Sequence, residues 1–413
     1  MRFQLTQLLV IAAMLIAPQP VVLAGDWPMF RGPGGRSIGE AENLPDEWSI
    51  EEQKNVAWQA NLPGRGVSGP IVVGGKVIVT SSSGPNRDRL HVSAFDSSSG
   101  KQLWHRQFWA TGKSLCHETS ANAAPTPASD GERIFAFYSS NDLIALDLEG
   151  NLLWMRGLEL DHPGAGNALG MSSSPVIVGD VVVVQSEAQG NSFVAAIDRA
   201  TGKTSWELDR LKASNWCSPI AIDAEYTIDK QPVIVLQSSE TIDLHRVDNG
   251  EKLLTIETEC ESIPSLTFDK YLYAPAQGIQ VFDVLSAGLD DKDEPVWSES
   301  KLQPGSPSPV VANGHVYVIN RSGVLTCGSL EEKEIAWKQR LGGRYWATPV
   351  LVGNRMYCVN ASGKCFVVEL GEPGEKGKIV AENDFGEDVL GSPAVADNGL
   401  FVRSHSHLWK IAK

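Results

Sequence analysis

The chain has 413 residues, of which 42% are hydrophobic and 21% charged, as is usual for a globular protein with a sizeable core. Its formal net charge of −15 disfavours contact with nucleic acid or with an anionic membrane surface, because both carry charge of the same sign. We therefore expect no nucleic-acid partner.

The first 24 residues have the layout of a secretory signal peptide. Arg2 supplies a positive charge, residues 8–16 form a short apolar run, and Val22 and Ala24 place small residues before a cleavage site at Gly25. The run is short for a membrane span, and a retained anchor is the alternative. No Cys stands at the cleavage point to carry a lipid. The pattern predicts a periplasmic or secreted protein that does not span the membrane.

Repetition at a period of about 45 residues is the strongest pattern in the chain and is typical of β-propellers. Each unit opens with a small residue and a proline, then an apolar strand, a polar turn and a second apolar strand. The opening prolines are Pro70, Pro127 (or Pro125), Pro175, Pro219, Pro264, Pro309, Pro349 and Pro393. They predict an all-β, eight-bladed propeller of four-stranded antiparallel blades over residues 55–413, preceded by an N-terminal extension at residues 25–54.

Most units close with a turn that contains glycine, followed by a tryptophan. In the best copies, residues 94–104 and 196–206, an Asp is placed to bind turn amides, a Gly permits positive φ, and the Trp offers a flat surface to the next blade. The tryptophans expected to dock blade on blade are Trp58, Trp104, Trp154, Trp206, Trp297 and Trp337. Thr255 and Val380 occupy two further positions where a tryptophan would be expected.

The order of these markers predicts how the ring closes. Trp58 precedes the first opening proline, whereas the unit from Pro393 ends at Lys413 without a closing strand of its own. We expect the strand around Trp58 to complete the last blade, which joins the two ends of the propeller and leaves no free edge.

These units resemble the pyrroloquinoline-quinone-type propeller repeat, whose docking motif has the form Ala-x-Asp-x-x-x-Gly-x-x-x-Trp. The copies ending at Trp104 and Trp206 match it in full, and residues 26–35 resemble the leader of exported propeller proteins abundant in planctomycete bacteria. The family includes quinoprotein alcohol dehydrogenases and the outer-membrane assembly scaffold BamB. The resemblance implies either a dehydrogenase with quinone and Ca²⁺ in the channel or a scaffold without catalysis.

The residues favour the scaffold. The chain has no adjacent Cys pair of the kind many dehydrogenases place over the quinone, and no cluster with Ca²⁺-ligand spacing. It also lacks a Gly-x-Ser-x-Gly elbow, a His-Glu-x-x-His motif and a P-loop. We expect a monomer without cofactor or metal that binds exported or outer-membrane proteins, or a small ligand. A dehydrogenase oxidising alcohols or sugars is the alternative.

Polar and aromatic residues gather in the loops that enter three of the units. In propellers these loops share one face and surround the channel mouth, where function usually resides. The candidate binding residues are His117, Glu118, Asn122, Trp216, Arg344, Tyr345 and Trp346. The alternative is that the tryptophans pack between inner strands and that His117 and Glu118 belong to a solvated loop.

The remaining His and Cys residues carry weaker signals. His405 and His407 alternate along one strand and are either two metal ligands or polar residues of a turn. The chain has six Cys and no Cys-x-x-Cys motif, which argues against thioredoxin-type and c-type haem chemistry. Cys358 and Cys365 flank a turn, and we expect that they can face each other across the hairpin, although the disulfide connectivity is open.

Overall fold

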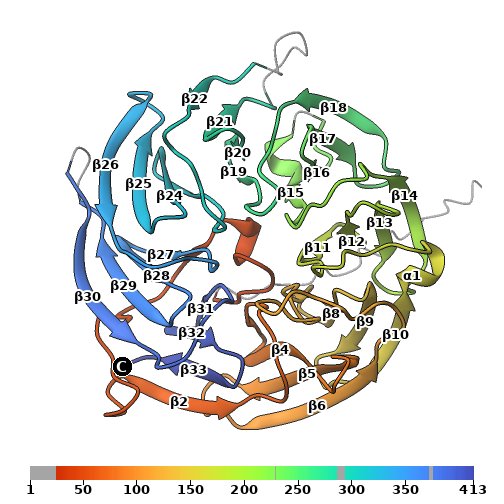
Figure 1. Cartoon of the computed structure of the whole chain (residues 1–413), viewed down its shortest axis with the longest axis horizontal. Coiled ribbons are helices and arrows are strands. Elements are labelled where there is room, and N and C mark those ends of the chain that lie inside the picture. Colours follow the sequence, from red (N-terminus) through yellow and green to blue (C-terminus); the bar gives the residue numbers. More distant parts are fainter. Residues whose placement is uncertain (1–24, 228, 286–293, 372–374) are drawn as a thin grey trace, which may run out of the picture.

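The computed structural model describes residues 25–227, 229–285, 294–371 and 375–413, and the predicted signal peptide lies outside them. The predicted fold is confirmed: eight sheets of antiparallel strands are arranged as blades in a ring (Figure 1). Helical structure is limited to α1 (Leu158–Asp161), η1 (Pro33–Gly35) and η2 (Ala224–Tyr226) in the described residues. Among those residues, no helix is long and apolar enough to cross a membrane.

The first four blades follow one another along the chain, each running from an inner to an outer strand. Blade 1 comprises β3 (Ile71–Val73), β4 (Lys76–Ser83), β5 (Arg89–Asp96) and β6 (Gln102–Trp109). Blade 2 comprises β7 (Ala128–Ser129), β8 (Arg133–Phe137), β9 (Asp142–Asp147) and β10 (Leu152–Gly157). Blade 3 comprises β11 (Val176–Val178), β12 (Val181–Ser186), β13 (Phe193–Asp198) and β14 (Thr204–Asp209). Blade 4 comprises β15 (Ile220–Ile222), β16 (Val233–Gln237), β17 (Thr241–Arg246) and β18 (Lys252–Glu257).

The next three blades repeat this order. Blade 5 comprises β19 (Thr267–Asp269), β20 (Tyr271–Pro275), β21 (Ile279–Phe282) and β22 (Trp297–Glu299). Blade 6 comprises β23 (Val310–Ala312), β24 (His315–Ile319), β25 (Val324–Ser329) and β26 (Glu334–Arg340). Blade 7 comprises β27 (Val350–Val352), β28 (Arg355–Val359), β29 (Lys364–Glu369) and β30 (Lys378–Asp384), with β1 (Ile38–Gly39) added in parallel to β27.

Blade 8 is built from both ends of the propeller, as predicted. Its inner three strands are β31 (Ala394–Ala396), β32 (Gly399–Arg403) and β33 (His407–Ile411), and its outer strand is β2 (Val56–Asn61). β2 pairs antiparallel with β33, so the red and blue ends of the chain lie side by side in Figure 1. This pairing closes the ring through backbone hydrogen bonds.

The docking tryptophans pack on glycines of the next blade. The four pairs with this geometry are Trp58 on Gly100, Trp104 on Gly150, Trp154 on Gly202 and Trp206 on Gly250. In each pair the indole N–H donates to a backbone oxygen of the same turn, at 2.7 to 3.1 Å. A Cβ on these glycines would lie 2.6 to 2.9 Å from the indole. Glycine is therefore needed there for the close approach as well as for its positive φ.

The other two tryptophans dock differently because the turns that face them differ. Trp297 packs against Gly328 within β25, and Trp337 packs against Gly377. At Val380, which replaces a tryptophan, the next blade has no turn between its third and outer strands, because β33 and β2 are distant in sequence.

The two cysteines of blade 7 lie on opposite faces of the sheet. Cys358 is paired with Phe366, and Cys365 with Val359, so their side chains are one position out of register. Cys358 belongs to the apolar core between blades 6 and 7, whereas Cys365 belongs to the core next to blade 8. The expectation that they face each other across the hairpin is wrong, and all six cysteines are free thiols.

Candidate ligand-binding cavity

The N-terminal extension runs through the middle of the ring rather than along its outside (red in Figure 1). It pairs with blade 1 through a bridge from Trp27 to Val72, and Pro28 accepts a hydrogen bond from Ser129 of blade 2 at 2.8 Å. Arg31 reaches blade 5, and β1 then joins blade 7. The extension thus crosses the channel and contacts the inner strands on opposite sides of it.

The channel contains a cavity of about 590 Å³, to which the segments leading into all eight inner strands contribute. Phe30 of the extension lines it as well. Its neighbours Met29 and Arg31 line a separate cavity of about 80 Å³. We describe the larger cavity as the cup, with Phe30 as its floor and the connecting loops as its rim.

A series of hydroxyl groups surrounds the cup just before the inner strands. The residues that carry them are Thr126, Ser174, Ser218, Ser265, Ser308, Thr348 and Ser392. Each side-chain oxygen accepts a hydrogen bond from the backbone N–H of the corresponding residue in the preceding blade, at 2.8 to 3.1 Å. We call these seven residues the hydroxyl ring.

The hydroxyl ring is open between blades 8 and 1. In blade 1 the residue equivalent to the ring hydroxyls is Gly69, which has no side chain to accept a hydrogen bond from the backbone N–H of Ser392. A Cβ at Gly69 would lie 2.8 Å from the carbonyl oxygen of Ser392, so the two backbones are too close for a side chain. The small residue before each opening proline was interpreted from sequence only as part of a repeat marker. Ser or Thr precedes six of the eight opening prolines, and in blade 5 Ser265 follows Pro264 instead. This recurrence is the signal from which the ring could have been found.

Five of the seven candidate binding residues line the cup, namely His117, Glu118, Trp216, Arg344 and Trp346. The other two do not line it. Asn122 is fully buried and uses its side chain within the fold, donating to Arg87 O and accepting from Ser140 N. Tyr345 is buried in the core between blades 6 and 7.

The rim segment with His117 and Glu118 is held by two arginines. Arg87 donates to the carbonyl oxygens of Cys116 and His117, at 3.3 Å each, and Arg65 donates to that of Glu118. His117 Nδ1 accepts from the backbone N–H of Thr119 at 3.2 Å, which leaves Nε2 as the protonated nitrogen of the neutral ring. Neither arginine forms an ion pair within the described residues.

Trp216 is fixed in the wall of the cup by three hydrogen bonds. Its indole N–H donates to Gly170 O and its backbone N–H to Ser262 O, both at 2.7 Å. Its carbonyl accepts from the Ser172 hydroxyl at 3.3 Å. Trp216 therefore joins the loops before blades 3, 4 and 5, and its ring orientation is set before any ligand arrives.

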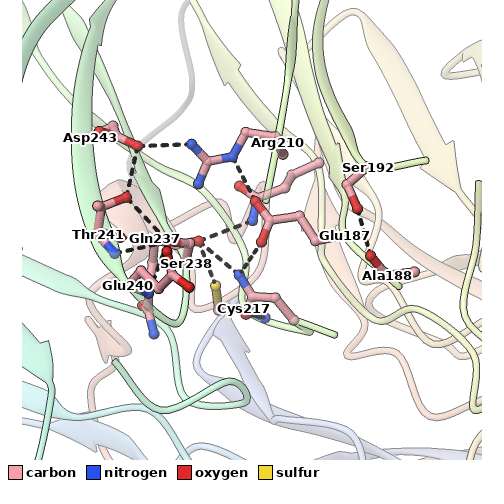
Figure 2. Close-up of polar contacts among 12 residues, drawn as sticks. Glu187, Ala188, Ser192, Arg210, Cys217, Gln237, Ser238, Glu240, Thr241 and Asp243 are labelled. Carbon is pink, nitrogen blue, oxygen red and sulfur yellow. Dashed lines mark hydrogen bonds and ion pairs between the residues drawn. The ribbon is translucent and has the colours of Figure 1, made fainter. Parts of the chain in front are cut away.

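A buried charge network supports the loop that carries Trp216 (Figure 2). Arg210 donates to Glu187 at 2.6 Å and to Asp243 at 3.0 Å, which joins blades 3 and 4. Asn215, next to Trp216, donates to the second oxygen of Glu187 at 2.9 Å and to Gln237 O at 2.7 Å. Sequence reasoning missed this network, whose members are far apart in the chain.

The two carboxylates of this network titrate differently. Burial raises the pKa of Glu187, and the charge of Arg210 offsets this only in part. At Asp243 burial is outweighed by hydrogen bonds from Thr255 and Arg210, so its pKa lies below the usual range. The single guanidinium thus holds two buried carboxylates between the blades.

The histidines near the C-terminus do not form a metal site in the structure. His405 Nδ1 lies 2.9 Å from Gly66 O, and His407 Nδ1 lies 2.5 Å from a carboxylate oxygen of Glu387. In the part of the chain that the structure describes, no group of three or more His, Cys, Asp or Glu residues is arranged to hold a metal ion.

Solved structures with the same fold have diverse functions. A europium-containing methanol dehydrogenase superposes with a TM-score of 0.73 at 14% identity, covering 94% of this chain and 98% of its own. The quinohemoprotein alcohol dehydrogenase of Comamonas testosteroni superposes with a TM-score of 0.70 at 14% identity, and the match covers 95% of this chain and 81% of the dehydrogenase. BamB from Moraxella catarrhalis superposes with a TM-score of 0.60 at 16% identity, and the match covers 87% of this chain and 97% of that BamB. At these identities the likeness establishes the fold alone.

The sequence comparison is more specific. No curated protein sequence matches the chain significantly. A family model described as outer membrane protein assembly factor BamB matches residues 49–229 and 283–371, which together make up more than half of the chain. The chain therefore belongs to the BamB family of pyrroloquinoline-quinone-type repeat propellers.

Proposed function

We propose that this protein is an exported, non-catalytic binding protein that receives part of another protein, or a small ligand, in the cup. The observation that carries the proposal is the form of the channel. It is floored by the protein's own N-terminal extension and lined by loops from all eight blades. Its volume lies in the range of ordinary ligand pockets, and its walls combine aromatic side chains with a few polar groups.

The lining of the cup does not fit a calcium-bound quinone. Ca²⁺ takes six to eight oxygen ligands, and carboxylates are prominent among them. Among the described residues that line the cup, Glu118 is the one carboxylate, it stands on an exposed part of the rim, and no Asp or Asn accompanies it. The same lining offers no Asp as a catalytic base. This donor set supports a binding role.

The family supports the choice of partner. Its model is named for an outer membrane protein assembly factor, and the N-terminal sequence has the layout of a signal peptide. The partners of this chain are accordingly exported or outer-membrane proteins rather than nucleic acids. The chain acts in the periplasm or outside the cell as a monomer.

The proposal is tested by capture of exported proteins on the immobilised mature chain. Ser306→Trp fills the cup from a half-buried position with no hydrogen-bond partner in the described residues, and Glu331→Trp adds the same ring on an exposed turn of the same blade. Partners held by the wild type and by Glu331→Trp, but lost from Ser306→Trp, support the proposal. Identical capture by the wild type and both variants would show that partners do not bind in the cup.

A quinoprotein dehydrogenase is the second candidate, because such enzymes share the propeller fold of this chain. Thermal unfolding with pyrroloquinoline quinone, with and without Ca²⁺, tests it, because a ligand that binds the folded state raises the midpoint. A Ca²⁺-dependent rise together with dye-linked oxidation of an alcohol or sugar would overturn the non-catalytic proposal.

A further inference from the structure

The cup is rich in hydrogen-bond donors. Each hydroxyl of the ring already accepts a backbone N–H, and none donates a hydrogen bond to another described residue. Because a hydroxyl carries one hydrogen and can rotate, seven O–H groups remain able to donate to an occupant. The indole N–H of Trp346 and the Nε2–H of His117 add further donors at the rim.

Among the described residues, one cation and one carboxylate line the cup, namely Arg344 and Glu118. Arg344 lines the rim, is exposed, and forms no ion pair with a described residue. Arg65 and Arg87 bind carbonyl oxygens behind the rim, and Arg65 also interacts electrostatically with Glu118. Below the floor, Arg31 is 2% exposed and binds Thr267 Oγ1 and Leu266 O, which are neutral acceptors. Because Glu118 interacts with Arg65, Arg344 is the cation of the lining that is available to an anionic occupant.

Large apolar side chains are exposed on the loops before blades 2 and 3. These loops are joined by hydrogen bonds from His117 N to Leu169 O at 3.0 Å and from Lys113 N to Glu159 Oε2 at 2.6 Å. Leu169 lines the cup and is 49% exposed. The other large apolar side chains exposed on these loops and at the adjacent strand end are Trp109, Leu115 and Leu160, at 59%, 71% and 72%. Leu169 therefore gives the cup an exposed apolar edge, and the other three side chains add exposed apolar surface on or beside the same two loops.

From these three features we infer that the cup binds the C-terminal carboxylate of a partner polypeptide, whose preceding apolar residues lie on the loops before blades 2 and 3. The carboxylate accepts hydrogen bonds from the hydroxyl ring and from Arg344, and charge-assisted bonds of this kind are the strong ones. The apolar side chains next to the terminus pack on Trp216 and Trp346. A free small carboxylate satisfies the donors but leaves the loop surface uncovered. This inference rests on the proposed binding role of the cup.

The test uses two peptide pools that differ only at the C-terminus. Both are randomised over the last four residues and fixed to beads through their N-termini, one ending in a free carboxylate and the other in an amide. Binding of the fluorescently labelled mature protein is measured on each pool. We expect at least tenfold more binding to the free-acid pool, a ratio that falls with rising salt because the charges are exposed.

Two variants and one competitor complete the experiment. Arg344→Gln removes the rim charge and should reduce the ratio between the pools severalfold, whereas Arg340→Gln removes another exposed arginine without an ion pair and should leave it unchanged. Benzoate tests the other source of a carboxylate. Competition by benzoate as effective as that of a free-acid peptide would overturn the polypeptide part of the inference.

Failure of this inference and failure of the proposed function would give different results. Equal binding of both pools, lost in Ser306→Trp, would overturn carboxylate recognition and leave the binding role of the cup in place. Absence of binding to either pool would also overturn this inference. The proposed function would fall only if capture of exported proteins were, in addition, unaffected by Ser306→Trp.

Discussion

Arg31 Nη1 donates a hydrogen bond to Thr267 Oγ1 at 2.7 Å, across 236 positions of the sequence. A second bond from Arg31 reaches Leu266 O at 2.6 Å, and burial lowers the pKa of the guanidinium to about 9. These two bonds fasten the N-terminal extension to blade 5 beside the floor of the cup. The extension is therefore part of the channel structure.

Arg31→Ala should destabilise the protein by about 2–4 kcal/mol, because buried acceptors lose their donor and a large cavity opens beside Phe30. Arg36→Ala is the matched control. Arg36 pairs with Asp269 where both side chains are partly exposed, at 36% and 29%, and such pairs contribute about 1 kcal/mol or less. Urea unfolding of both variants measures the difference, and equal losses would show that Arg31 does not fasten the extension.

Gly100→Ala should cost about 2 kcal/mol more than Gly314→Ala. Both glycines have positive φ, at +70° and +73°, so the backbone strain of an alanine is shared. A Cβ at Gly100 would also lie 2.6 Å from the indole of Trp58, whereas nothing lies within 4 Å at Gly314. Thermal unfolding of the two variants isolates the tryptophan contact. Similar midpoints would mean that the indole shifts at little cost.

Arg210→Met should destabilise the protein by about 3–5 kcal/mol, because Glu187 and Asp243 would stay buried without their cation. Glu187→Gln, which retains hydrogen-bonding groups, should cost less. Both variants should also weaken binding at the cup, because Glu187 holds Asn215 by a hydrogen bond and Asn215 directly precedes Trp216 in the chain. Denaturation and peptide binding are measured on the same samples, and unchanged binding in a destabilised but folded variant would contradict that link.

The stability of the protein should fall as the pH is lowered from about 6.5 towards 4. Burial lowers the pKa of His91 to about 4, and the neighbouring His105, whose Nε2 lies 2.9 Å from His91 Nδ1, adds to the shift. In that range the unfolded chain binds a proton that the folded chain does not, so acid favours unfolding, by on the order of 3 kcal/mol at most. His91→Gln should flatten the pH dependence of the unfolding free energy. If the variant showed the same pH dependence of the unfolding free energy as the wild type, groups other than His91 would be responsible for that dependence.

Only one thiol should react rapidly with an alkylating reagent in the folded protein. Cys116 is partly exposed, whereas the other five cysteines are buried. Burial raises the pKa of Cys260 and of Cys327 to about 12, which removes the reactive thiolate at pH 8. Mass spectrometry after brief alkylation should find a single modification, lost in Cys116→Ser. Fast labelling of several thiols would show that the blades open readily.

The repeat architecture was predictable from the sequence because its signals are local. The prolines, glycines and tryptophans of each unit lie within one period of about 45 residues, and eight copies reinforce one another. The closing strand was predictable for the same reason, since Trp58 stood before the first unit and the last unit lacked its closing strand. The rim loops could be placed on one face, and five of the seven residues selected from them line the cup.

The floor of the cup and the choice among the rim residues were decided only by the tertiary structure. Nothing in residues 26–35 reveals that Phe30 lines a cavity together with the loops of eight blades, because the cavity brings together positions hundreds of residues apart. Asn122 and Tyr345 have residue types as suitable for binding as their neighbours, yet local backbone geometry turns them into the interior. A sequence specifies which residues enter a loop, whereas the packing of the blades determines which of them reach the cavity.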